Sequence, residues 1–84
     1  MINYLMICRS LTYAQKMAKV LERAGITAIV TRTPQEISEE GCGYCVKVSE
    51  KRLSDALISL KDADMTPNRI YLLFANGHFS EVSV

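Results

Sequence analysis

The sequence lacks a strong excess of charge and a long apolar run, and each absence excludes a class of protein. Ten basic residues stand against nine acidic ones, so the net charge of +1 draws neither nucleic acid nor an anionic membrane to the chain. Residues 1–8 are apolar, but this stretch is short, has no basic leader and is followed by Arg9. It predicts neither a secretory signal nor a membrane span.

Cysteine and histidine are also scarce. The three cysteines, Cys8, Cys42 and Cys45, are an odd number in a chain with no recognisable leader, which argues against a framework of structural disulfides. We therefore expect thiols at rest in a reducing cytoplasm. The one histidine, His78, follows an Asn76-Gly77 turn signal and is expected to be a solvated residue rather than a metal ligand.

The remaining composition is that of an ordinary soluble domain. Hydrophobic residues make up 49% of the 84 residues and charged residues 23%, which predicts a folded chain rather than a disordered one. This length leaves no room for a second core, and the chain shows no repeat, linker or low-complexity tract. Residues 1–84 are expected to form one domain without a cofactor.

Two segments have the apolar spacing of helices, and four are typical of β-strands. Ser10 can cap the first helix, which Gly25 would end, and Ser49 can cap the second. Thr33 followed by Pro34 is typical of an N-cap before a short helical turn. The predicted strands are residues 2–8, 26–31, 44–48 and 69–75, and residues 78–84 could add an edge strand.

This order, β-α-β-β-α-β, predicts an α+β fold, the ferredoxin-like plait, in which two helices cover one face of a four-stranded antiparallel sheet. The first and third strands are neighbours at the centre of such a sheet. The end of the first strand, with Cys8, then lies beside the start of the third, with Cys42 and Cys45. The start of the fourth strand brings Arg69 to the same end of the sheet.

The motif Gly41-Cys42-Gly43-Tyr44-Cys45 is the part of the chain that most resembles a chemical site. Two thiols at this spacing can form a disulfide, share a metal ion or pass a sulfur atom between them. Gly41 and Gly43 leave little bulk beside the thiols. The motif leads into a strand, whereas the thioredoxin motif opens a helix, so only the spacing is shared.

The start of the first helix is expected at the same place. A helix N-terminus at Ser10 and the guanidinium of Arg9 would both favour the thiolate form of a neighbouring cysteine. All three thiols are therefore predicted to gather at one end of the sheet. Taken alone, Cys8 at the end of an apolar strand is more often a small packed core residue than a nucleophile.

The sequence resembles the small bacterial selenium/sulfur carrier protein-like family over nearly its whole length. The residues that carry the resemblance are Cys8-Arg9-Ser10, Gly25-Ile26, Thr31-Arg32-Thr33-Pro34, Gly41-Cys42-Gly43-Tyr44-Cys45 and Tyr71-Leu72. The resemblance implies a carrier that holds reduced sulfur or selenium on cysteine, as a persulfide or selenosulfide. Its partners would be a donor enzyme, such as a cysteine desulfurase, and an acceptor protein.

Three interpretations follow from these residues. The first is a cytoplasmic carrier rather than an enzyme, in which Cys42 or Cys45 is loaded and the other, or Cys8, resolves the persulfide. The second is a zinc- or small-ligand-binding module in which all three thiolates bind the metal. The third is a regulatory plait with redox-sensing cysteines that dimerises through its open sheet face. Because two helices cover only one face, a homodimer or cover by residues 79–84 is expected.

Overall fold

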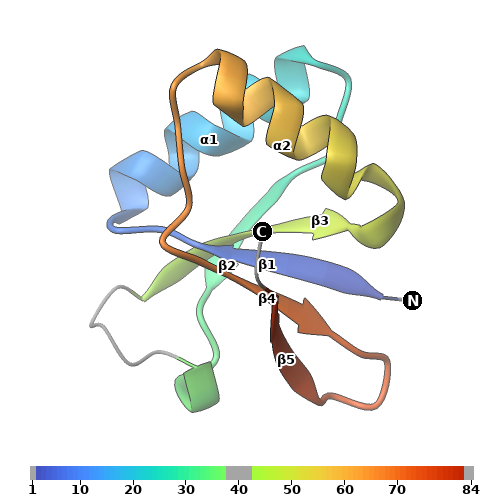
Figure 1. Ribbon diagram of the computed structural model, residues 1–84. Coiled ribbons are helices and arrows are strands. Elements are labelled where there is room, and N and C mark those ends of the chain that lie inside the picture. Colours follow the sequence, from blue (N-terminus) through green and yellow to red (C-terminus); the bar gives the residue numbers. More distant parts are fainter. Residues whose placement is uncertain (1, 38–42, 83–84) are drawn as a thin grey trace.

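The computed structural model describes residues 2–37 and 43–82 of the chain (Figure 1). Within them, two helices and two short 3-10 turns connect five strands. The elements in chain order are β1 (Asn3–Ile7), α1 (Leu11–Arg23), β2 (Ile29–Arg32), η1 (Gln35–Ile37), β3 (Tyr44–Ser49), η2 (Glu50–Arg52), α2 (Leu53–Asp62), β4 (Arg69–Leu73) and β5 (Phe79–Val82).

The five strands form one antiparallel sheet in the order β2-β3-β1-β4-β5, with both helices on the same face (Figure 1). The predicted α+β class, the antiparallel sheet and the two helices are confirmed. The order of β2, β3, β1 and β4 is the order expected of the plait. The predicted count of four strands is wrong, because the tail pairs with β4 through a turn at Gly77, whose φ is +89°.

The start of α1 follows the sequence prediction. The Ser10 side chain caps the helix by accepting a hydrogen bond of 3.1 Å from the backbone N–H of Tyr13. Gly25, with a φ of +81°, follows its C-terminal end. The N–H of Ile26 bonds the Leu21 carbonyl at 2.9 Å as part of this helix end. This explains why β2 begins at Ile29 and not, as predicted, at position 26.

The second predicted helix begins with a tighter turn than expected. The Ser49 side chain accepts from the N–H of Lys51 at 3.4 Å, and the residues that follow form η2 before the chain continues as α2. The short turn predicted after Pro34 is confirmed as η1, in which the N–H of Ile37 bonds the Pro34 carbonyl at 3.1 Å.

Apolar side chains are buried on both faces of the sheet. The helix-covered face packs the inner stripes of α1 and α2 against the sheet, and its fully or nearly fully buried residues are Met6, Cys8, Ala14, Met17, Leu21, Ile26, Val46, Val48, Ala56, Leu60 and Ile70. The opposite face holds a smaller cluster of Leu5, Ile7, Ile37, Cys45 and Tyr71. We call it the η1 face, because η1 supplies Ile37.

The η1 face does not expose the apolar side chains of the central strand as predicted. Leu5 is 2% exposed and Ile7 4% exposed. Cross-strand neighbours such as Tyr71 and the side chain of Ile37 pack in the same cluster. Phe79 of the tail also packs against this cluster, which supports the predicted cover by residues 79–84. The homodimer, the other predicted outcome, stays a prediction. Among the helices of the described residues, none is long and apolar enough to cross a membrane.

The Tyr13 hydroxyl joins α1 to the connection between α2 and β4. It accepts a hydrogen bond of 2.8 Å from the Thr66 N–H and lies 3.2 Å from the Thr66 carbonyl oxygen, to which it donates. We predict that Tyr13→Phe lowers the free energy of unfolding by about 1–2 kcal/mol, because the Thr66 backbone loses both bonds. Urea unfolding followed by circular dichroism measures this. Tyr4→Phe is the control, and an equal loss in both variants would contradict the assignment.

Candidate functional site

The ends of β1 and β3 place the backbones of Cys8 and Cys45 side by side. Ile7 lies directly across from Cys45 in the β1–β3 ladder, and the N–H of Cys8 donates to the Tyr44 carbonyl at 3.4 Å. Cys42 and Gly41 lie outside the described residues. The predicted meeting of the first and third strands is therefore observed in the backbone for two of the three cysteines.

The side chains of these two cysteines lie on opposite faces of the sheet. The Cys8 thiol is in the helix-covered cluster, where its Sγ is 3.3 Å from the Sδ of Met17 and 3.4 Å from the Met6 carbonyl oxygen. Cys45 is in the cluster on the η1 face. Residue i and its cross-strand partner share a face, so Cys45 is on the same side as Ile7 and Cys8 is on the other. This corrects the expectation that all three thiols gather.

The residues at the start of α1 lie on the helix-covered side of the sheet. The guanidinium carbon of Arg9 is 4.9 Å from the centroid of the Tyr13 ring, a cation–π distance, and Ser10 is engaged in capping. Arg9 and Ser10 are thus placed beside the face that holds Cys8.

Arg69 is a cation on the face of Cys45. It lies across from Ile7 in the β1–β4 ladder, and its neighbour Ile70 belongs to the helix-covered cluster, so the Arg69 side chain lies on the η1 face. Its Nε is 4.0 Å from a carboxylate oxygen of Glu81 on β5. Arg69, Ile7 and Cys45 therefore form one cross-strand row. The predicted position of Arg69 at this end of the sheet is observed.

Thr33 lies in this region, and its observed contacts differ from those predicted from the sequence. Its N–H donates to the Gly43 carbonyl at 2.7 Å, which extends the β2–β3 ladder by one step. Its hydroxyl is buried and has no hydrogen-bond partner among residues 2–37 and 43–82, so it does not cap η1 as predicted. The pattern Thr-Pro suggested an N-cap, and no feature of the sequence shows whether the threonine hydroxyl accepts a hydrogen bond from the turn that follows.

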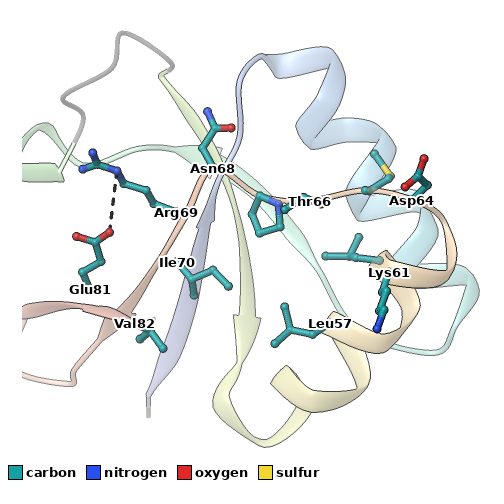
Figure 2. Close-up of a pocket in the computed structure, with 12 residues that line it drawn as sticks. Leu57, Lys61, Asp64, Thr66, Asn68, Arg69, Ile70, Glu81 and Val82 are labelled. Atoms are coloured by element: carbon teal, nitrogen blue, oxygen red, sulfur yellow. Dashed lines mark ion pairs between the residues drawn. The ribbon is translucent and has the colours of Figure 1, made fainter. Parts of the chain in front are cut away.

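A groove lies between the end of α2 and the β4–β5 edge (Figure 2). It encloses about 450 Å³ over an apolar floor that includes Leu57, Ile70 and Val82. The Arg69–Glu81 ion pair lies at its rim (Figure 2). No cysteine is among its lining residues. Arg69 therefore belongs both to this groove and to the face of Cys45.

The geometry also bears on the zinc interpretation. In the described part of the chain, no three His, Cys, Asp or Glu side chains come close enough to hold a metal ion. The distance from a zinc ion to each cysteine sulfur is about 2.3 Å. One zinc ion therefore cannot bind two sulfur atoms that lie on opposite faces of a sheet. A site using Cys8 together with Cys45 does not fit this fold.

These features define a small α+β protein in which Cys8 and Cys45, the cysteines of the described residues, are buried on opposite faces of the central strand pair. The family model described as "Putative Se/S carrier protein-like" matches residues 3–72, and the chain belongs to this family. The match includes Cys8 and the whole Gly41–Cys45 motif and ends before β5. No curated protein and no solved structure is similar enough to count as a match.

Proposed function

We propose that this protein is a cytoplasmic carrier that holds reduced sulfur or selenium on the Cys-x-x-Cys motif and passes it from a donor enzyme to an acceptor protein. The observation that carries the proposal is the family match over residues 3–72, which includes both motif cysteines. The scaffold would be a ferredoxin-like plait extended by β5.

The burial of the thiols suggests a division of roles. Cys45 is fully buried, so a bulky donor enzyme cannot reach its sulfur in this conformation. We assign the first acceptance of sulfur to Cys42 and the resolving attack to Cys45. Cys8 is packed against Met17 on the opposite face, and we assign it a structural role. Arg69 would supply positive charge near the motif, and Gly41 and Gly43 would keep the motif free of side-chain bulk.

The transfer balances without an external oxidant. The Cys42 thiolate attacks the terminal sulfur of the donor's persulfide, the donor's S–S bond breaks, and the donor leaves as a thiolate. In release, the Cys45 thiolate attacks the Cys42 sulfur. A Cys42–Cys45 disulfide forms, and the carried sulfur leaves as hydrosulfide with the electron pair of the broken bond, to be taken up by the acceptor protein. A dithiol reductant then reduces the Cys42–Cys45 disulfide to two thiols and is itself oxidised to a disulfide.

Sulfur loading by a cysteine desulfurase tests this function. The reduced wild-type chain is incubated with the desulfurase and cysteine, and its intact mass is compared with that of a variant in which all three cysteines are serine. We expect one added sulfur on the wild type and none on the variant. The zinc content of protein purified under reducing conditions distinguishes a metal-binding module from a carrier. No sulfur uptake together with stoichiometric zinc would contradict the carrier.

A further inference from the structure

The strand β2 forms one edge of the sheet, and part of its backbone faces away from the other strands. In the strand order, β3 is the neighbour of β2 among the described strands. The Thr33 N–H bonds the Gly43 carbonyl, and in an antiparallel ladder such bonded pairs alternate with pairs that exchange no bonds. The N–H and C=O groups of Val30 and Arg32 therefore point away from β3. Such an edge is a template for pairing with another chain.

A groove lies beside this edge, between α1 and β2. It has a volume of about 610 Å³, and its lining residues are Thr12, Gln15, Lys16, Ala18, Lys19, Glu22, Ala28 and Val30. We call Thr12, Gln15, Lys16, Lys19 and Glu22 the α1 stripe. At about 1.5 Å per residue the stripe is about 15 Å long, and the β2 strand spans about 13 Å. This similar length suits an extended segment better than a compact ligand.

The charge beside the groove is mainly positive. Lys16 and Lys19 are exposed, and neither has an ion-pair partner among residues 2–37 and 43–82. Arg32 lies on the same face of β2 as Val30, with its guanidinium carbon 5.6 Å from the centroid of the Tyr44 ring. Among the described residues that line the groove, Glu22 is the acidic one. Three cations against one carboxylate favour an acidic ligand.

The other face of the same edge is apolar. Ile29 lies on the η1 face, because its cross-strand partner Lys47 is also the partner of Leu5, a residue of that cluster. The Ile29 side chain is 49% exposed, and an apolar residue on an added strand would cover it. The edge therefore favours a segment with acidic side chains on one face and apolar side chains on the other.

We propose that β2 and the α1 stripe bind an extended acidic segment of a protein partner as an added antiparallel strand. Its acidic side chains lie against Lys16 and Lys19, and its apolar side chains lie beside Ile29. A second copy of this chain does not fit, because antiparallel pairing of two β2 edges about a two-fold axis brings two basic stripes together. The added strand lies about 10 Å from β3, which carries Cys45. The inference concerns partner recognition and does not depend on sulfur transfer.

A designed peptide tests this surface. The probe is a fluorescein-labelled peptide of about ten alternating glutamates and valines, which as a strand presents carboxylates on one face and apolar groups on the other. One control peptide has lysine in place of glutamate, and another has the same composition in two blocks. Binding at low salt is followed by fluorescence anisotropy. We expect the alternating acidic peptide to bind at least about tenfold more tightly than either control.

Two double variants separate the α1 stripe from the total charge of the protein. Lys16→Glu/Lys19→Glu reverses the charge of the stripe. Lys51→Glu/Lys61→Glu makes the same change in net charge elsewhere, and all four lysines are exposed, so circular dichroism should show both variants folded. We expect the first variant to weaken peptide binding at least about tenfold and the second by less than about threefold. Equal weakening by both variants, or none by the first, would contradict the site.

Backbone methylation of the peptide tests the added strand. In the antiparallel pairing the glutamate amides face β2, because glutamate lies across from Val30 and Arg32, and the valine amides point away. Methylation of the glutamate amides should weaken binding at least about tenfold, whereas methylation of the valine amides should have little effect. Amide hydrogen exchange of Val30 and Arg32 should slow at least about tenfold in the complex. Equal loss from both methylations, loss from the valine set alone, or unchanged exchange would overturn the antiparallel strand.

Other occupants of this edge give different results. If single-stranded DNA of the same charge binds as tightly as the peptide, the stripe is a general anion-binding surface and the proposal is wrong. If the unbound chain sediments as a dimer that the peptide dissociates, the edge belongs to a second copy and the proposal is wrong. No binding of the acidic peptide at about millimolar concentration would also overturn it. Sulfur loading is measured separately, so failure of the carrier function leaves these results unchanged.

Discussion

Cys42→Ser is expected to abolish sulfur loading, whereas Cys45→Ser is expected to load and then fail to release hydrosulfide. The difference follows from the assigned roles. Without Cys42 no thiolate accepts the donor's sulfur, and the buried Cys45 cannot replace it. Without Cys45 no second thiolate attacks the persulfide, so the loaded form accumulates. Intact mass measures the loading, and a colorimetric sulfide assay measures the release.

Cys8 provides the matched control for these variants. Cys8→Ala removes a thiol that packs against Met17 on the helix-covered face. We expect a loss of about 1–2 kcal/mol in the free energy of unfolding and unchanged loading and release. If Cys8→Ala at a temperature where it is fully folded loses its loading, the assignment of Cys8 to packing is wrong. Equal behaviour of Cys42→Ser and Cys45→Ser would contradict the division of roles.

Leu60→Ala in α2 is expected to lower the free energy of unfolding by about 2–5 kcal/mol. The Leu60 side chain is 1% exposed and belongs to the helix-covered cluster, so its removal leaves a cavity between α2 and the sheet. Such a loss is a large share of the total stability of about 5–15 kcal/mol that is typical of small domains. The chain has no tryptophan, so urea unfolding is best followed by circular dichroism.

Ile58 in the same helix is the control for this substitution. Its side chain is 60% exposed, and Ile58→Ala is expected to change the free energy of unfolding by less than about 0.5 kcal/mol. The two variants remove similar groups from one helix and differ in burial. Similar losses in both would mean that α2 does not pack on the sheet as described.

The sequence was sufficient for the element order and for the meeting of the β1 and β3 ends. Caps at Ser10 and Ser49 and the turn at Gly77 are local features, and each is observed at or next to its predicted place. The start of β2 was misplaced because the N–H of Ile26 is used by the end of α1, a competition that alternation of apolar residues does not reveal.

The sequence could not predict which face of the sheet each cysteine side chain lies on. Whether Cys8 and Cys45 share a face depends on the register between two strands far apart in the sequence, and a shift of one residue would reverse the answer. Cover of the η1 face by residues 79–84 was predicted as one alternative, and Phe79 packs against its cluster. The contribution of Ile37 from η1 was missed, because a long-range contact of one side chain has no period in the sequence.

Peptide mapping of the loaded wild-type chain tests the central claim most directly. Cleavage after lysine and arginine separates Cys8, in residues 1–9, from Cys42 and Cys45, in residues 33–47. After loading by a desulfurase and trapping with an alkylating reagent, tandem mass spectrometry locates the added sulfur. The carrier described here predicts it on the peptide of residues 33–47, at Cys42. Added sulfur on the peptide of residues 1–9, or on neither peptide, would contradict it.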